Sequence, residues 1–281
     1  MATSISTSFV TLFDAEVKQA YQEDRALAGA TRERAGVKGN TYKFNKLGSG
    51  VANLHIAQSD ITPLNLTHSL ASATLSDYNA AEYSDVFTAG KVLFDERAEL
   101  VKALSMAIGR RMDQLVIDAV DGASTSLTVA NSIGGSNTNL NIEKVAQTKK
   151  LLDTKGVPAE DRYFLCHANN MGAFLQESQV GSFDYNTSKA LALGQVDTFL
   201  GFKFIQIGDR DEGGLAIDGS SDRTCLAWHK NAVGLALNMD RKTEINYVAE
   251  KASWLVNSMF SAGSVGIDAN GIVEITCRDT A

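Results

Sequence analysis

One stretch of the sequence, residues 91–121, has the pattern of a single amphipathic helix of unusual length. Asp95 and Glu96 stand where acids stabilise a helix N-terminus, and Gly122 stands where a helix commonly ends. At about 1.5 Å per residue, such a helix would be about 45 Å long, more than a compact domain of this size requires. The sequence therefore predicts a spine for an elongated molecule. The apolar residues that would line its buried face, at three- and four-residue spacing, are Phe94, Ala98, Val101, Leu104, Ile108, Met112, Leu115 and Ala119.

The segment before this helix predicts a long hairpin without a core of its own. Residues 51–56 and 64–70 both alternate between apolar and polar side chains, as half-exposed strands do, and Pro63 lies in the connection between them. Most of the other side chains in this segment are small and polar, so the hairpin has too few large apolar groups to support itself. Because isolated hairpins are at best marginally stable, we expect it to lean on another surface.

The charges around this hairpin fall into two blocks of opposite sign. Between residues 25 and 46 there is one acid, Glu33, and between residues 47 and 90 there is no Lys or Arg. Such blocks are typical of segments that meet another copy of the same chain, although two solvated faces would look the same. The candidate interface residues are Arg25, Arg32, Arg34, Lys38, Lys43, Lys46, Asp60, Asp77, Glu82 and Asp85.

The remaining pattern is mixed and predicts an α+β fold with a projecting arm. Helical spacing from Phe13 to Ala28, followed by Gly29, predicts an N-terminal helix. Gly, Ser, Thr and Asn dominate residues 122–141 and predict a surface loop with one short strand. Two further helices are predicted at 142–152 and 168–177. The predicted strands after the long helix are 162–166, 202–207, 225–228, 244–248, 254–262 and 272–277.

Composition and motifs point away from an enzyme. Hydrophobic residues make up 44% of the chain and charged residues 21%, which excludes a disordered chain. The net charge of −7 argues against a dedicated nucleic-acid binder. No apolar run is long enough to span a bilayer, the N-terminus has no secretory pattern, and three cysteines favour a reducing cytoplasm. The phosphate-binding glycine motifs and the nucleophile elbow are missing.

Three clusters that could carry chemistry have simpler explanations. Cys166–His167 with Cys225 and His229 could offer zinc ligands, but neighbours in a strand point to opposite faces, so we interpret the thiols as buried hydrophobes. Residues 209–214 resemble the start of a calcium loop, yet Ser220 stands where the bidentate Glu belongs, which favours an acidic turn. Arg110 and Arg111 on the long helix are expected to form salt bridges. We expect no catalytic residue, no cofactor and no metal.

Several segments together resemble the major capsid proteins of tailed bacteriophages, the HK97-like family. The resemblance covers nearly the whole chain, and each motif alone is moderately specific. The similar segments are 62–64, 73–78, 82–85, the stretch Ile108-Gly109-Arg110-Arg111-Met112-Asp113 in the long helix, and 162–168, 200–205, 227–234 and 266–275.

This resemblance implies a fold with an N-terminal arm (1–35), an extended E-loop hairpin (36–88), a peripheral domain carrying the spine helix (89–160), an axial domain (161–245) and strands that return to the peripheral domain (246–281). It implies self-assembly as pentamers and hexamers into an icosahedral head around double-stranded DNA, formed in the host bacterial cytoplasm and ending in the virion. Portal and scaffolding proteins follow by analogy, a cement protein is allowed, DNA contact would be weak and non-specific, and no membrane is involved.

The alternatives are an encapsulin-like shell, which shares the fold, and a cytosolic enzyme. Some members of the fold cross-link their shells through a Lys–Asn isopeptide bond. We find no matching Lys, Asn and acid here, so that chemistry is not carried over.

Overall fold

The computed structural model describes residues 22–89, 91, 95–177, 180 and 198–279 of the chain. The strands are β1 (Arg32–Arg34), β2 (Thr41–Leu47), β3 (His68–Thr74), β4 (Ser76–Asp85), β5 (Thr128–Val129), β6 (Arg162–His167), β7 (Thr198–Phe199), β8 (Phe202–Ile207), β9 (Asp222–His229), β10 (Val233–Val248), β11 (Ser253–Gly266) and β12 (Ile272–Arg278). The helices are α1 (Val86–Ala89), α2 (Glu96–Asp121), α3 (Ile142–Thr154) and α4 (Ala168–Gln176), with short 3-10 turns η1 (Lys230–Ala232), η2 (Ala249–Lys251) and η3 (Ala269–Gly271).

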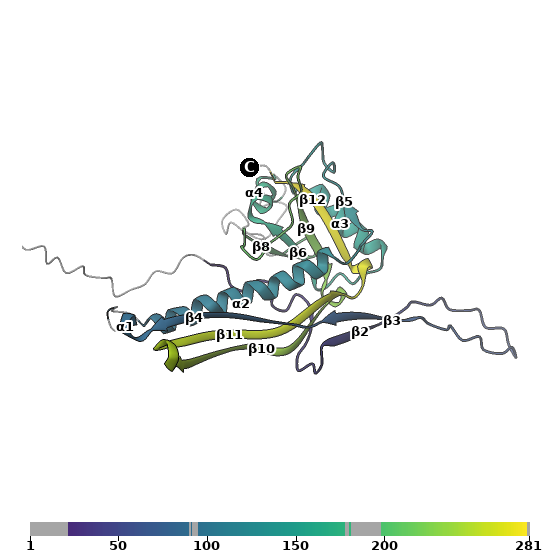
Figure 1. Ribbon diagram of the computed structural model, residues 1–281. Coiled ribbons are helices and arrows are strands. Elements are labelled where there is room, and N and C mark those ends of the chain that lie inside the picture. Colours follow the sequence, from purple (N-terminus) through teal and green to yellow (C-terminus); the bar gives the residue numbers. More distant parts are fainter. Residues whose placement is uncertain (1–21, 90, 92–94, 178–179, 181–197, 280–281) are drawn as a thin grey trace, which may run out of the picture.

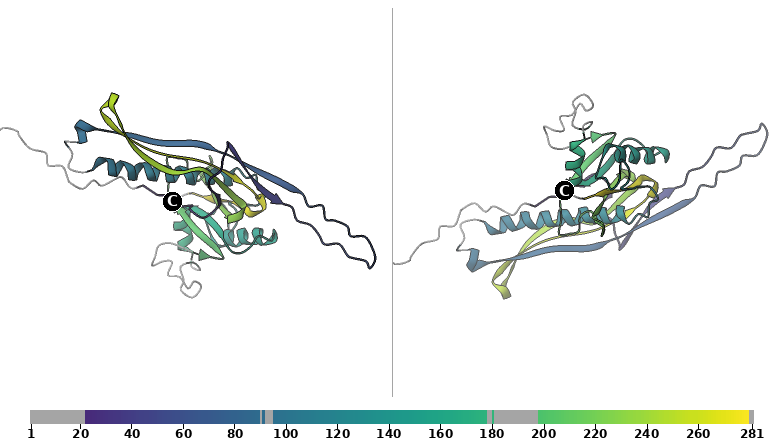
Figure 2. Two further views of the ribbon diagram at one scale, coloured as in Figure 1. Left: turned by 90° about the horizontal axis from the view of Figure 1, so that it is seen from below. Right: turned by 90° about the horizontal axis from the view of Figure 1, so that it is seen from above.

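Two sheets and one hairpin make up the strand architecture. The order β1-β10-β11-β4 forms a long four-stranded sheet, and β5-β12-β9-β6-β8-β7 forms a six-stranded mixed sheet. In Figure 1, α2 runs along the four-stranded sheet, and the six-stranded sheet stands at one end of it with α3 and α4. The β2–β3 hairpin and the α1 end project in opposite directions, which the views from above and below confirm (Figure 2). The predicted α+β class is confirmed.

Helix α2 is the predicted spine, although it begins later than expected. Asp95 caps it by accepting a hydrogen bond from the Ala98 amide, and Gly122 ends it by donating to the Asp118 carbonyl at 2.9 Å. Its 26 residues correspond to about 39 Å. Residues 92–94, where the helix was predicted to start, lie outside the described residues. The buried side chains begin only at Ile108, so the first half of the spine is not core.

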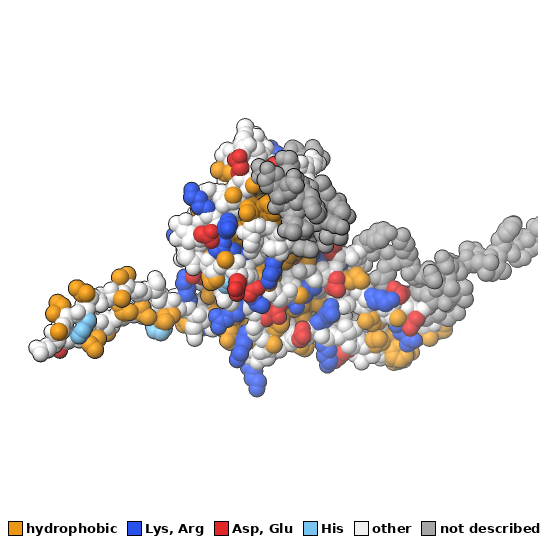
Figure 3. Space-filling view, turned by 180° about the vertical axis from the view of Figure 1, so that it is seen from behind, with side chains coloured by type: hydrophobic (Ala, Val, Ile, Leu, Met, Phe, Trp, Pro, Cys, Tyr) orange, Lys and Arg blue, Asp and Glu red, His pale blue; other side chains and the backbone are white. Residues whose placement is uncertain are grey.

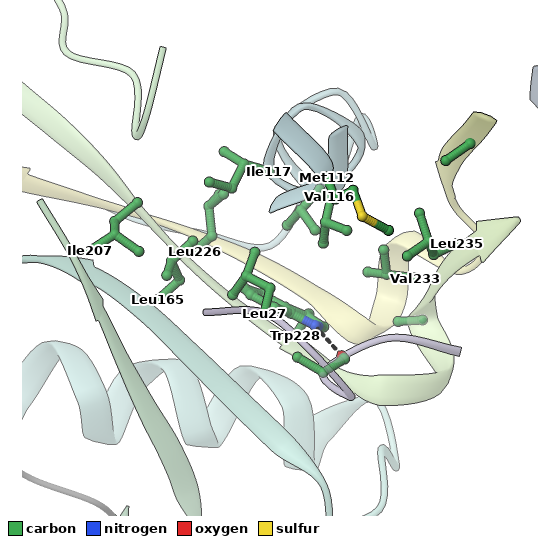
Figure 4. Close-up of a cluster of buried hydrophobic side chains, with 14 of the residues drawn as sticks. Leu27, Met112, Val116, Ile117, Leu165, Ile207, Leu226, Trp228, Val233 and Leu235 are labelled. Carbon is green, nitrogen blue, oxygen red and sulfur yellow. Dashed lines mark hydrogen bonds between the residues drawn. The ribbon is translucent and has the colours of Figure 1, made fainter. Parts of the chain in front are cut away.

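The largest core joins α2 to both sheets and to the chain segment before β1. Met112 and Val116, one helical turn apart, contact the cluster that holds Leu27 and Trp228 (Figure 4). Trp228 Nε1 donates to the Ala30 carbonyl at 2.9 Å, which fixes the segment before β1 onto the six-stranded sheet. Toward the end of the helix the predicted face was wrong by one position, because Val116 is buried while Leu115 is only partly buried.

Alternate residues of the six-stranded sheet serve two different cores. Leu165 of β6 joins the core under α2, whereas its neighbours Phe164 and Cys166 join a second core with α3 and α4. A sheet that is covered on both faces needs apolar residues at consecutive positions, which explains the near-continuous apolar run of β6. The predicted helices 142–152 and 168–177 are confirmed as α3 and α4. The strands predicted after α2 match β6 and β8–β12, with the predicted bounds for β8 and longer bounds for the others.

A small third core fixes the root of the hairpin to the four-stranded sheet. Its buried members are Val37, Phe44, Ala73, Leu75 and Ala236. Two glycines of the four-stranded sheet permit the hairpin root to approach the sheet closely. A Cβ at Gly234 would lie 2.6 Å from the Phe44 ring, and one at Gly263 would lie 2.1 Å from the Thr74 carbonyl oxygen.

The hairpin is present, but its paired strands are not the predicted ones. β2 pairs with β3 from Thr41↔Thr74 to Leu47↔His68, whereas residues 51–56 and most of 64–70 lie beyond this ladder. We call residues 48–67 the hairpin tip. Among its described backbone groups, Gly48 donates to Thr67 and Ser59 to Ile56, but no strand forms. The alternation at 51–56 is a local pattern, whereas strand pairing is established where Phe44 and Ala73 pack on the sheet.

Two further differences concern the N-terminal half. The predicted helix from Phe13 to Ala28 lies mostly outside the described residues, and residues 22–27 have no helical structure. Strand β4 was not predicted, because its sequence is mostly polar. It is stabilised by a ten-residue antiparallel ladder to β11, and Tyr78 stacks on Phe260 at 5.1 Å between ring centroids.

Candidate assembly surfaces

The hairpin tip exposes apolar side chains that contact little of their own chain. Leu54 is 93% exposed, Ile61 86%, and Val51 83%. Figure 3 shows hydrophobic side chains along both sides of the projecting hairpin. Burial of one such side chain contributes roughly 1.5–3 kcal/mol, so covering the tip with another surface would be strongly favourable. An exposed apolar surface of this kind marks an interaction site.

A second exposed apolar group lies at the opposite end of the molecule. Its members lie at the end of β4, on α1 and at the end of β10, three elements whose places Figure 1 shows. Its members are Tyr83, Val86, Phe87, Ile245 and Tyr247, of which Phe87 is the most exposed at 70%. The two apolar surfaces are therefore far apart on one subunit and cannot bury each other.

Within the described residues, the four-stranded sheet ends in a long edge strand, whereas the six-stranded sheet ends in very short ones. β4 is an edge strand of ten residues that pairs with β11 on one side only. The edge strands of the six-stranded sheet, β5 and β7, have two residues each. Long exposed edges invite pairing with other chains, and short ones prevent it. The elongated half of the molecule is therefore the half suited to association.

Most residues of the basic block lie on β1, on β2 or between them, at the hairpin root, whereas Arg25 lies before β1 beside α2. Arg25 pairs with Glu33 at 2.6 Å, and Lys46 pairs with Asp268 at 2.7 Å. The Arg32 guanidinium lies 6.0 Å from the centroid of the Phe44 ring. The three other members, Arg34, Lys38 and Lys43, are exposed.

The residues of the acidic block lie on two elements. Asp60 is in the hairpin tip, and Asp77, Glu82 and Asp85 are on the edge strand β4. The in-chain partners of Arg25 and Lys46 are not among these four acids. Each acid of β4 is thus carried on the open sheet edge.

A polar groove lies between the hairpin root and the turn before β12. Its cavity volume is about 620 Å³, and its lining includes Lys46, Lys155, His229 and Asp268. The Lys46–Asp268 ion pair joins the hairpin to the body across this groove. Because both side chains are about one third exposed, the pair contributes little to stability.

The chain segment before β1 crosses α2 and packs on its residues Ile108 to Asp113. A Cβ at Gly109 would lie 2.9 Å from Asp24 Oδ1, so glycine allows the segment to cross α2 closely. The buried Asp113 carboxylate accepts hydrogen bonds from the Ala26 and Leu27 amides at 2.7 and 3.1 Å. Burial raises the pKa of Asp113, and the amide hydrogen bonds and Arg210, 3.1 Å away, oppose that shift.

Residues 209–214 were predicted as an acidic hairpin turn, and the hairpin is wrong, because β6 lies between β8 and β9 in the sheet. The segment is part of the connection between these two strands, and its charges have structural partners. Arg210 pairs with Asp113 and with Glu23, and Glu212 pairs with Arg110 at 2.9 Å. The prediction of a salt bridge is confirmed for Arg110. Arg111 instead lies 4.9 Å over the Tyr78 ring, a cation–π contact.

The cysteines and histidines that could have bound zinc have other positions. Cys166 and Cys225 are fully buried in the second core, where desolvation raises the pKa of the Cys166 thiol. His167 caps α4 and His229 caps η1, each through Nδ1. Within the part of the chain that the structure describes, no group of three or more metal-binding side chains comes together. No described helix combines the length and apolar character needed to cross a bilayer.

Taken together, the geometry defines an elongated α+β subunit with exposed apolar surfaces at both ends. Its fold matches the capsid of the cyanophage P-SCSP1u with a TM-score of 0.78 at 17% identity, covering 100% of this chain and 96% of that one. It matches a structure from Mycobacterium phage Che8 at 0.75 and 16% identity, covering 97% and 98%. It also matches the head structure of the Helicobacter pylori bacteriophage KHP40 at 0.78 and 9% identity, covering 100% and 99%.

The sequence itself matches the phage capsid protein family over residues 5–279, and the chain belongs to that family. Curated proteins gave no significant match. The α+β fold is that of HK97-like phage capsids. The predictions of a phage capsid protein, a structural component of the virion and not an enzyme, are confirmed by the family.

Proposed function

We propose that this chain is the major capsid protein of a tailed phage and assembles as pentamers and hexamers into the icosahedral head around double-stranded DNA. The observation that carries the proposal is the hairpin tip, which exposes Val51, Leu54 and Ile61 and has no ladder of its own. A closed symmetric shell buries such a surface on every subunit, because each copy meets an equivalent neighbour. Full-length similarity to capsid structures supports this assignment.

We further propose the subdomains of that fold for this chain. The arm comprises residues 1–35, the E-loop 36–88, and the peripheral domain 89–160 with the returning strands 246–281. The axial domain comprises 161–245. The β2–β3 hairpin supports the E-loop, and α2 supports the spine of the peripheral domain. The pairing of β10 with β11 along most of its length favours moving the end of the proposed axial domain from residue 245 to about Val233.

We propose that the basic block and the acidic block meet across subunit boundaries. Arg34, Lys38 and Lys43 are exposed at the hairpin root, and Asp77 is exposed on the β4 edge. Single exposed pairs contribute only about 0–1 kcal/mol, so their value lies in setting register and rejecting wrong docking. Packaged DNA would contact the inner wall weakly, and portal and scaffolding proteins would act as in related phages.

Electron microscopy of the full chain expressed alone, wild type and Leu54→Asp, tests the shell proposal. We expect shells from the wild type. The variant should give soluble subunits with an unchanged melting temperature, since Leu54 contributes nothing to the fold of its own subunit. Leu200→Asp, at an exposed body position, is the matched control and should still assemble. Small particles from the wild type would contradict the proposal, and DNA-filled tailed particles in the native source would exclude an encapsulin-like compartment.

Charge reversal tests the pairing of the two blocks. Arg32→Glu with Arg34→Glu should reduce shell yield, and adding Asp77→Lys with Glu82→Lys should restore part of it. The control, Lys149→Glu with Lys150→Glu, changes the net charge equally on α3, outside both blocks, and should leave yield unchanged. Equal losses in the two double variants, or no rescue, would exclude specific pairing. High salt should slow wild-type assembly, because screening weakens exposed pairs.

A further inference from the structure

His167 lies where a strand of the six-stranded sheet becomes a helix. It is the last residue of β6 and the N-cap of α4, and its Nδ1 accepts a hydrogen bond from the Asn169 amide at 3.3 Å. A ring nitrogen that accepts a hydrogen bond carries no proton, so the single proton of the neutral ring is on Nε2. Nε2 itself is buried and has no hydrogen-bond partner in the described structure.

Charged groups from four other segments surround this imidazole. Asp209, in the turn after β8, lies 3.3 Å from Nε2, and Asp279, after β12, lies 4.0 Å from Nδ1. Arg223 of β9 pairs with Asp279 at 2.7 Å and lies 3.4 Å from Asp209. Glu23, before β1, adds a more distant negative charge. The ring therefore lies between two carboxylates that attract a proton and a guanidinium that repels one.

The Asn169 amide and the Asp279 carboxylate compete for the same ring nitrogen, Nδ1, whereas Asp209 lies at Nε2. Protonation places a hydrogen on Nδ1, which then faces the Asn169 N–H donor and cannot accept from it. The positive ring would also stand at the N-terminus of α4, where the helix dipole disfavours cations. The Asp279 carboxylate is the nearest acceptor for the new N–H. Asp279 also accepts a hydrogen bond from the Asn169 side chain at 3.3 Å. Asn169 and Asp279 are therefore in contact with each other whether the ring is neutral or protonated.

We propose that His167 is a pH-operated switch that caps α4 when neutral and, when protonated, releases the cap to pair with Asp279 and Asp209. In the neutral state the first turn of α4 is fixed to the end of β6. In the protonated state the ring draws the segments after β8 and after β12 together, and the first turn of α4 frays. Burial, followed by Arg223, holds the pKa of His167 below its ordinary value, so the switch operates on the acid side of 6.5.

A structurally parallel histidine provides a matched control. His229 ends β9 and caps η1 through Nδ1, which accepts from the Asn231 amide at 3.2 Å. Its charged neighbours are Asp161 and Arg162, not the group around His167. Substitution by Asn keeps a strong N-cap at either position but removes the titration.

Hydrogen–deuterium exchange of the full chain between pH 7.5 and 5, corrected for the intrinsic exchange rate, tests the switch. In the wild type and in His229→Asn, the protection of the first turn of α4 should fall about fivefold, the ratio expected for loss of one cap. In His167→Asn the protection should stay constant. A constant wild-type protection, or the same fall in His167→Asn, would overturn the proposal.

Nitrogen NMR of the imidazole groups gives a second test that requires no variant to fold. At pH 7.5 the His167 resonances should show the proton on Nε2 and a bare Nδ1. A proton on Nδ1 at neutral pH would mean that the ring does not cap α4, and the switch would be excluded.

Discussion

Replacement of Gly263 by Ala should separate the hairpin root from the four-stranded sheet. A Cβ at this position would lie 2.1 Å from the Thr74 carbonyl oxygen, 2.7 Å from its carbonyl carbon and 3.2 Å from Leu75 Cα. Ordinary contacts begin near 3.4 Å, so the chain at Thr74 must retreat by about 1.3 Å. All three neighbours are backbone atoms, and a rotamer change cannot relieve the overlap.

The cost follows from what the displaced chain holds. Leu75 is buried in the third core, and its amide donates to the Asn40 carbonyl at 2.9 Å. Overpacking costs about 1–3 kcal/mol, and a core with only five buried members has few ways to adapt. We expect a loss of about 2–3 kcal/mol in the free energy of unfolding. At about 2–4 °C per kcal/mol, the melting temperature should fall by roughly 4–12 °C.

Thermal unfolding of the dissociated subunit, followed by circular dichroism, measures this effect. Gly219→Ala is the matched control, since a Cβ there meets nothing within 4 Å. Shell yield should fall together with the melting temperature, because the hairpin would leave the body at a different angle. If Gly263→Ala melts within about 1 °C of the control, the close crossing of Thr74 over β11 does not exist as described.

Two further predictions concern buried charge and pH. Asp113→Ala removes the acceptor of the Ala26 and Leu27 amides and leaves Arg210 without its buried partner, so we expect a loss of about 3–5 kcal/mol in denaturant unfolding. A loss as small as that of Asp24→Ala, an exposed neighbour, would show that the pair is not buried. Burial lowers the pKa of His229, so the unfolded chain binds more protons below pH 6.5 and stability is lost as the pH falls through that value. The melting temperature should therefore fall between pH 7 and 5, less steeply in His229→Asn, and an unchanged slope in that variant would refute the assignment.

The sequence predicted the elements whose signals are local. The three-four spacing of Ile108 and Met112, the acids at Asp95 and Glu96 and the glycine at Gly122 were enough to predict α2, but they did not show that Asp95 is its cap. The apolar run from Tyr163 to Cys166 was enough to predict a buried strand. In each case the residues that determine the element lie within a few positions of one another.

The missed features depend on contacts between distant residues. The position of the hairpin ladder depends on the packing of Phe44 on Gly234, which lies 190 positions later in the sequence. No pattern of neighbouring residues can predict that contact. The burial of Asp113 also has no local signal, because its partner Arg210 is remote in sequence. The sequence showed which residues carry charge. The surface that the side chain of Arg34 or Asp77 reaches is determined only by the positions of β1 and β4 in the sheet.

The order in which the strands pair also has a consequence for synthesis. β11 lies between β10 and β4, and β12 lies between β5 and β9, so each sheet has as an inner member a strand that follows its partners in the sequence. The ribosome therefore synthesises β11 and β12 after the strands that each of them pairs with. A chain interrupted before β11 can complete neither sheet, and it therefore cannot present the open edge and the anchored hairpin together. A product that ends before β11 therefore lacks the surfaces on which we propose that assembly depends.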